Sequence, residues 1–263
     1  MKTYRAGKDG KVVLIAGGNK IYTDIAARFV RSERDLEEIV SSPYDKNIVK
    51  NILEGGHLAA TEFDYFIFGV EGYSRVTETQ LVRKRMASYL IKSGRVELNG
   101  KRSFDVAYPE SLKRYSTYVN IDNEEIEITT ERLLYILQKF YEDGVKGGYP
   151  EEDLRYFKPQ ATAFKGIIGM NAHALLDFLS VRLCKNAQTE IRDMAWKMLR
   201  LCKKAAPDLF AEAGPHCVRL GYCPENKYQH PDCKGKIYTK DQVKQILHSK
   251  KIDELICGEE IND

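Results

Sequence analysis

One short stretch of the chain combines the side chains that bind phosphate oxygens. It reads RKRMASYLIKSGR, residues 83–95 of 263, and its five cations lie close to two serines and a glycine. These cations are Arg83, Lys84, Arg85, Lys92 and Arg95. Planar guanidinium groups bind phosphate oxygens in pairs, and backbone N–H groups beside a glycine add donors. The stretch therefore favours a site for a phosphate-bearing ligand.

A solvated basic helix end is the plainer interpretation, because cations near a helix C-terminus are mildly stabilising. On an ideal helix, however, Arg83 and Arg85 point about 200° apart and do not share one solvent face. At least one of them should then turn toward protein or ligand. The longer segment 83–102 contains seven basic residues and one acid, Glu97, so its charge is strongly positive.

The surrounding segments predict an α+β fold that is rich in helix. Apolar and β-branched runs predict strands at 11–18, 63–74 and 161–171. A helix should open between Ser74 and Thr77, where Thr77 and Gln80 have capping-box spacing. We expect it to carry Val76, Gln80, Arg83 and Ala87 along one face.

The remaining helices follow from apolar periodicity and from cap and stop residues. Two short helices are expected within 32–57, the first capped by Ser32 and the second ended by Gly55 and Gly56. A long amphipathic helix should start at Thr130, with an inward face made of Leu133, Leu134, Leu137, Phe140 and Tyr141. Further helices are expected after Pro150 and at 172–183, 188–206 and 239–256, the last docking on a partner surface. Polar residues 96–124 predict an excursion loop.

Composition limits the class of protein. Hydrophobic residues make up 43% and charged residues 30% of the chain, as in a globular protein with a full core. A net charge of only +3 argues against a general nucleic-acid binder. The apolar run VVLIA is too short for a signal peptide or a membrane span, so we expect a cytoplasmic protein without membrane contact. We divide the chain into a domain at 1–213 and a tail at 214–263.

The tail contains the stretch HCVRLGYCPENKYQHPDC, which offers ligands for zinc. The candidate ligands are Cys217, Cys223, His230 and Cys233. Their spacing is unlike a standard zinc finger, and reduced cysteines that pack a small tail are the plainer alternative. We therefore assign no metal and keep zinc as an alternative. Cys184 and Cys202 are expected on inward helix faces.

Three blocks resemble the flavin-dependent thymidylate synthases. Residues 56–95 resemble that family's central region, which has an Arg-His-Arg triplet, then Ser, then Asn-Glu and Ser-Gly-Arg. Residues 155–192 resemble its segment with an Asn-x-Arg helix start and a Gln-x-Glu-Ile. Residues 213–225, AGPHCVRLGYCPE, resemble the tail of many bacterial members. Together the blocks span roughly 50–225 in the family's order.

The resemblance implies the family's fold, with a small central mixed or antiparallel sheet, and its chemistry. Members are homotetramers that bind FAD across subunits and methylate dUMP. They use methylenetetrahydrofolate for carbon and NADPH for electrons. Because reduced flavin does the redox work, the protein mainly positions and polarises the reactants.

The resemblance also implies residue roles. The cofactor-binding set would be His57, Arg83, Lys84, Arg85, Asn171, His173 and Asp177. The substrate-binding set would be Gln80, Ser93, Gly94, Arg95, Arg155 and Arg182. Arg182 would be the catalytic residue, stabilising negative charge that develops on the uracil ring. Without the resemblance, Arg182 could instead form a salt bridge at a helix end, and Asn171 could cap the following helix. His57 could have a capping or loop role instead of binding a ligand.

The chain departs from the family at several of these positions. Lys84 stands where the family has the middle His, Leu90 and Ile91 replace Asn-Glu, and Val96 replaces a Tyr. His173 replaces an Arg and Asp177 an Asn. These changes leave open a paralogue that acts on another pyrimidine nucleotide or hydroxymethylates it. A non-catalytic nucleotide- or nucleic-acid-binding protein is a third reading, since 16 tyrosines could stack on bases.

Overall fold

A four-stranded antiparallel sheet forms the centre of the protein. A computed structural model describes residues 5–6, 10–19, 21–93 and 104–249. The sheet has the order β2 (Lys11–Ala16), β3 (Tyr65–Ser74), β8 (Ala163–Asn171), β4 (Ser88–Ile91). The α+β class and three of these strands are as the sequence predicted, whereas β4 was not predicted.

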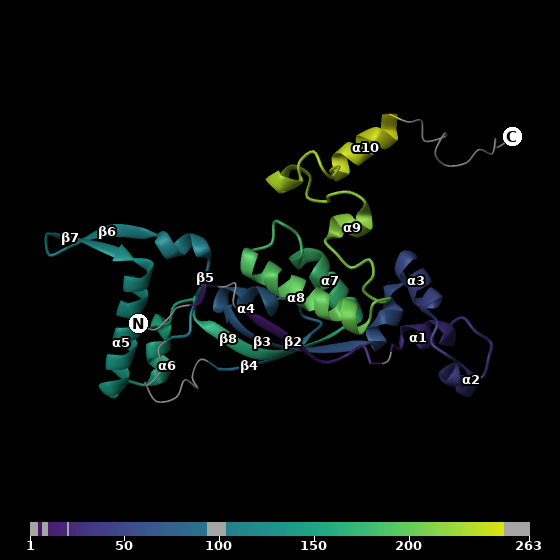
Figure 1. The fold of residues 1–263 in the computed structure, drawn as a ribbon, viewed down its shortest axis with the longest axis horizontal. Coiled ribbons are helices and arrows are strands. Elements are labelled where there is room, and N and C mark those ends of the chain that lie inside the picture. The colour runs from purple at the N-terminus through teal and green to yellow at the C-terminus, as the bar shows by residue number, and fades with distance from the viewer. Residues whose placement is uncertain (1–4, 7–9, 20, 94–103, 250–263) are drawn as a thin grey trace.

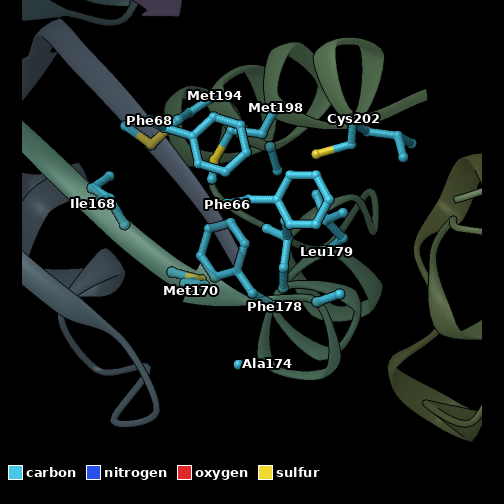
Figure 2. Close-up of a cluster of buried hydrophobic side chains, with 14 of the residues drawn as sticks. Phe66, Phe68, Ile168, Met170, Ala174, Phe178, Leu179, Met194, Met198 and Cys202 are labelled. Carbon is cyan, nitrogen blue, oxygen red and sulfur yellow. The ribbon is translucent and has the colours of Figure 1, made fainter. Parts of the chain in front are cut away.

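One face of this sheet is buried under helices. Phe68 of β3 pairs with Ile168 of β8, and both side chains are fully buried. The covering helices are α7 (Ala172–Arg182) and α8 (Thr189–Ala205), which lie over the sheet in Figure 1. Figure 2 shows Met194, Met198 and Cys202 meeting the phenylalanines of β3, and the Phe66 ring meets Phe210 edge-on at 5.2 Å. The main core therefore lies between the sheet and these two helices.

The other face of the sheet is apolar and open. Val13, Gly69, Ile167 and Leu90 stand opposite one another in register across the four strands. The side chains in this row are 55% exposed at Val13, 44% at Ile167 and 74% at Leu90. Such a contiguous apolar surface is typical of a protein–protein contact.

The remaining elements flank the sheet. The helices α1 (Thr23–Phe29), α2 (Leu36–Ser41) and α3 (Lys46–Glu54) connect β2 to β3, and α4 (Arg75–Leu81) joins β3 to β4. The short strands β1 (Arg5–Ala6) and β5 (Ala107–Tyr108) pair in parallel. The tail contains α9 (His216–Leu220) and α10 (Lys240–Ser249), which project away from the core in Figure 1. None of the described helices is both long and apolar enough to cross a bilayer.

A second lobe replaces most of the expected excursion loop. The part of residues 96–124 that the structure describes enters a hairpin of β6 (Ser116–Ile121) and β7 (Glu124–Thr129), followed by α5 (Thr130–Lys146) and α6 (Glu151–Leu154). The loop prediction was wrong there because Asp122 and Asn123 adopt left-handed backbone conformations and close a tight two-residue turn. The polar strand residues concealed the hairpin, since both faces of the hairpin are mostly exposed.

Several helix details also differ from the predictions. Asp35, not Ser32, precedes α2, and Ser74, not Thr77, caps α4 by accepting a hydrogen bond from Thr77 N–H. On α5 the side chains of Leu133 and Phe140 are half exposed, because the lobe presents only a narrow apolar stripe. That stripe packs in a cluster of Phe104, Val106, Tyr108, Leu134, Tyr141 and Leu154. Helix α1 was not predicted, and the 1–213/214–263 division stays a prediction.

Candidate functional site

The basic residues 83–85 lie on a turn, not on a helix. Helix α4 ends at Leu81, and the chain then turns into β4 at Ser88. The expected helical face that included Arg83 and Ala87 is therefore wrong. Pairing of β4 with β8 adds sheet hydrogen bonds that a continued helix would forgo. The Tyr89 hydroxyl lies 2.8 Å from the carbonyl oxygens of both Leu81 and Lys84, and this contact holds the turn against the strand.

A buried carboxylate fixes the start of α4. Glu190 of α8 accepts hydrogen bonds from Ser74 N at 2.7 Å, from the Ser74 hydroxyl and from Thr77 Oγ1 at 2.7 Å. All three residues are buried. Glu190 belongs to the Gln-x-Glu-Ile block, but no local pattern around it indicates this role. Its carboxylate ties α4, and hence the basic turn that follows, to α8.

We expect Glu190→Ala to lower the free energy of unfolding by about 2–4 kcal/mol, because three buried donors lose their acceptor. Glu190→Gln should lose less, since its amide oxygen can still accept. Urea denaturation of both variants measures the difference. Glu33→Gln, at an exposed site, is the matched control and should change the free energy by less than about 0.5 kcal/mol. Equal stability of Glu190→Ala and the natural chain would contradict the assignment.

Helix α7 carries three of the candidate residues and begins at a fourth. The Asn171 side chain accepts from Ala174 N at 2.8 Å, so the capping role that the sequence left open is confirmed. His173 and Asp177 lie one turn apart on this helix, and Arg182 is its last residue. A cavity of about 420 Å³ is lined by His173 and Asp177 together with Leu58, Gly214 and Val218. The helix therefore lines a cavity between the core and the start of the tail.

Arg182 lies beside the basic turn. Its guanidinium donates to the backbone carbonyl of Gln80 at 3.1 Å and to Gln80 Oε1 at 3.4 Å. Burial, and then the nearby charge of Arg83, lower the pKa of Arg182. Within the described residues neither Arg83 nor Arg182 forms an ion pair with a carboxylate, so the salt-bridge reading of Arg182 finds no partner there. Two guanidinium groups whose charges act on one another without a paired carboxylate favour an anion nearby.

The charged departures from the family pattern find partners in this fold. Lys84 Nζ lies 2.5 Å from Asp177 Oδ2, and His173 Nδ1 lies 3.0 Å from Glu62 Oε1. The acid at 177 is therefore neutralised by the lysine that stands in the middle of the basic triplet. The side chains of Leu90 and Ile91 lie on opposite faces of the sheet. Leu90 extends the open apolar row, and Ile91 packs against the main core.

A double-mutant cycle with Lys84→Ala and Asp177→Ala is expected to give a coupling of roughly 0.5–1 kcal/mol. The value is modest because the Asp177 side chain is 55% exposed and solvent screens the pair. Urea unfolding of the two single variants and the double variant measures it. Lys50 and Glu54, 3.6 Å apart and both exposed, form the control pair, for which about 0.3 kcal/mol is expected. Strict additivity at 84 and 177 would show that the two charges act independently.

Not all candidate residues lie together in one chain. Arg155 is exposed at the end of α6, which lies with α5 away from α7 in Figure 1. His57 is exposed and precedes the 3₁₀ helix Leu58–Phe63, which packs against α7. Arg85 and Ser93 are also exposed. Gly94, Arg95 and Val96 lie outside the described residues.

The tail cysteines approach a residue that the zinc alternative did not include. Cys184 lies two residues beyond α7, not on an inward helix face, because the helix ends at Arg182. Its thiol and those of Cys223 and Cys233 lie close enough to Cys217 to raise the pKa of that thiol further, after burial. His230 Nδ1 instead accepts a hydrogen bond from Asp232 N at 3.1 Å. Among the described residues, no three His, Cys, Asp or Glu side chains already form a metal ligand set.

Residues 16–208 match the family model described as "Thymidylate synthase complementing protein". A flavin-dependent thymidylate synthase from Thermococcus onnurineus is 37% identical over 201 residues, which cover 74% of this chain and 78% of that protein. The corresponding protein from Pyrococcus furiosus is 34% identical over 227 residues, which cover 83% of this chain and 88% of that protein. A flavin-dependent thymidylate synthase from Nitratidesulfovibrio vulgaris is 39% identical over 179 residues, which cover 68% of this chain and 72% of that protein.

Solved structures show the same fold at lower sequence identity. The crystal structure of a UMP/dUMP methylase, PolB from Streptomyces cacaoi, bound with 5-Br dUMP, superposes with a TM-score of 0.62 at 20% identity. The superposition covers 79% of this chain and 95% of that chain. A second structure of that enzyme, bound with 5-Br UMP, gives 0.59.

Proposed function

The chain belongs to the flavin-dependent thymidylate synthase family, and from that premise we propose that it methylates dUMP to dTMP with FAD as its bound cofactor. The observation that carries the proposal to this chain is the Arg182 guanidinium, which Gln80 holds at the start of the basic turn, where the charge of Arg83 lowers its pKa and no carboxylate among the described residues pairs with either arginine. Two phosphate-bearing ligands, a dinucleotide and a mononucleotide, supply the negative charge that these arginines lack.

The residues around the basic turn fit a flavin dinucleotide. Arg83 and Arg85 are exposed on the turn and have no ion-pair partner within the described residues, so their donors are available to phosphate oxygens. Bound FAD would supply the redox chemistry of the reaction. Lys84 neutralises Asp177 and so removes a charge that would repel a pyrophosphate. Asn171 already uses its side-chain oxygen as a cap and keeps its amide N–H groups for a ligand.

The nucleotide would lie against Gln80 and Arg182. Gln80 holds the Arg182 guanidinium from two atoms and so fixes the plane of its donors. Two of these donors would reach a uracil carbonyl and stabilise negative charge as it develops on the ring. Partial burial strengthens this interaction, because less water screens it. We assign Ser93 to the nucleotide as well.

We further propose a homotetramer whose sites are shared between subunits, with methylenetetrahydrofolate and NADPH as co-substrates. The open apolar row of Val13, Ile167 and Leu90 supports a subunit contact, since it exposes hydrophobic area on a rigid sheet. A site shared between subunits would also give Arg155 a role. Arg155 lies apart from Arg182 in its own chain, and it would reach the phosphate of a nucleotide bound to another subunit. A cytoplasmic location stays a prediction.

A product assay tests the proposal. Purified protein should show a flavin absorption band that NADPH bleaches, and it should convert dUMP to dTMP only when methylenetetrahydrofolate is present. Mass spectrometry of parallel reactions with dUMP and dCMP identifies both base and product. A hydroxymethylated product, or turnover of dCMP alone, would replace the proposed reaction with that of a divergent paralogue. Colourless protein that takes up no flavin but binds oligonucleotides in a salt-sensitive way would favour the non-catalytic reading.

A further inference from the structure

Over residues 214–249, the part of the tail that the structure describes, no separate hydrophobic core is formed. Between 214 and 249, Cys223 and Gln229 are the buried residues that the structure describes. The segment nevertheless has a defined course, with α9, two 3₁₀ turns and α10. Segments below about 40 residues usually need a disulfide, a metal or a partner to hold such a course. Some cross-link beyond apolar packing is therefore expected.

Polar contacts bring the tail against the last turn of α7 and the segment that follows it. Lys185 Nζ lies 2.7 Å from Asp232 Oδ2, and Asn186 Nδ2 donates to Tyr228 O at 2.9 Å. Ser180 Oγ lies 3.3 Å from His216 Nε2. Lys185 and Asp232 are the chain neighbours of Cys184 and Cys233, so their ion pair brings those two cysteines toward each other.

The same place contains a cavity and four thiols. The cavity, of about 220 Å³, is lined by Cys184, Cys217 and Cys223 and also by Arg182. We include Cys233 in the group because Asp232, its chain neighbour, pairs at 2.7 Å with Lys185, the chain neighbour of Cys184. None of the four forms a disulfide. Cys202, by contrast, is buried inside the main core on α8.

We propose that Cys184, Cys217, Cys223 and Cys233 bind one structural zinc ion that fastens the tail to the end of α7. Zinc accepts four thiolates in a closed tetrahedron, and this set supplies four sulfur atoms from both sides of the contact. His230 is replaced by Cys184, a residue of the core rather than of the tail. The thiols must turn toward one centre on binding, and each releases its proton as it becomes a thiolate.

The ion would serve both the tail and the site. Four thiolates around one divalent cation would join residues on both sides of the contact between the tail and the core. Because Arg182 and Cys184 are two residues apart and line the same cavity, the ion would also hold the end of α7 in place. We therefore expect zinc to be a fixed component of the folded chain, with or without flavin.

Elemental analysis of the full-length protein tests the proposal. The natural chain should contain about one zinc per chain, as a closed four-ligand site requires. Each of Cys184→Ser, Cys217→Ser, Cys223→Ser and Cys233→Ser should lower zinc content roughly tenfold or more after dialysis against a chelator. Cys202→Ala and His230→Gln are the controls and should keep the metal. Flavin content and circular dichroism, recorded alongside, show that the core of each variant is folded.

A measurement on the unaltered protein avoids any folding defect of the variants. Cobalt(II) added to chelator-treated protein should give the intense near-ultraviolet and visible bands of tetrahedral thiolate ligation. Absence of these bands and of zinc would overturn the proposal. So would retention of zinc by Cys184→Ser with loss by His230→Gln, which would place the metal in the tail alone. Mass spectrometry that finds these cysteines in disulfides would overturn it as well.

Discussion

Arg182→Ala is expected to lower kcat for dTMP formation by about 10²–10³-fold, as loss of one donor to a developing oxyanion does in other enzymes. The Arg182 guanidinium is held by Gln80 at two atoms, so its donors are oriented before substrate arrives. Preorganised charge of this kind acts mainly on the transition state, and KM should change less than kcat. Arg182→Lys should recover only part of the loss, since an ammonium cannot present two parallel donors.

Steady-state kinetics with dUMP, together with the flavin content of each variant, measure this effect. Arg200→Ala removes an exposed arginine from α8 and is the matched control, which should retain kcat within about twofold. A variant that keeps its flavin and its kcat without Arg182 would show that this residue does not act on the uracil. Loss of flavin in parallel with kcat would instead place Arg182 in cofactor binding.

Arg83→Ala is expected to weaken FAD binding by roughly 10- to 100-fold, because a charge-assisted hydrogen bond to phosphate contributes about 1.5–3 kcal/mol. The same change removes the positive charge that helps to lower the pKa of Arg182, so the cofactor-free chain should be slightly more stable. The two effects have opposite signs. Weaker FAD binding together with a more stable cofactor-free chain is the result expected of a residue that is retained for ligand binding and not for fold stability.

Fluorescence titration with FAD and thermal unfolding of the cofactor-free protein measure the two effects separately. Arg85→Ala tests the neighbouring cation on the same turn, and Arg200→Ala again supplies a control far from it. Unchanged FAD affinity together with higher stability in Arg83→Ala would mean that the Arg83–Arg182 pair does not bind the cofactor. That outcome would leave the family membership intact but would move the flavin phosphates to other residues.

The sequence was informative wherever a pattern is local. Strands β3 and β8 and helices α7 and α8 were predicted because burial on one or both faces imposes a period on consecutive residues. The role of Asn171 as a helix cap was likewise foreseeable, since capping depends on the next three residues. The family resemblance located the basic turn and Arg182, but it did not show how they meet.

Local patterns failed where a distant partner decides the conformation. Arg83 and Ala87 were expected on the helix that starts near Ser74, yet pairing with β8 and the Tyr89 hydrogen bonds make residues 82–91 a turn and a strand. The β6–β7 hairpin lacks a buried face and therefore carries no alternating pattern. Glu190 is a charged residue in a helix, and only the position of α4 above it reveals why it is buried.

The sequence by itself determined the α+β class, the positions of the long elements and the types of side chain available for phosphate binding. Only the tertiary structure decided which of them meet. Lys84 and Asp177, 93 residues apart, pair because α7 passes the basic turn, and Cys184 approaches the tail thiols because α7 ends there. Contacts of this kind depend on chain topology, and no local preference of either residue encodes them.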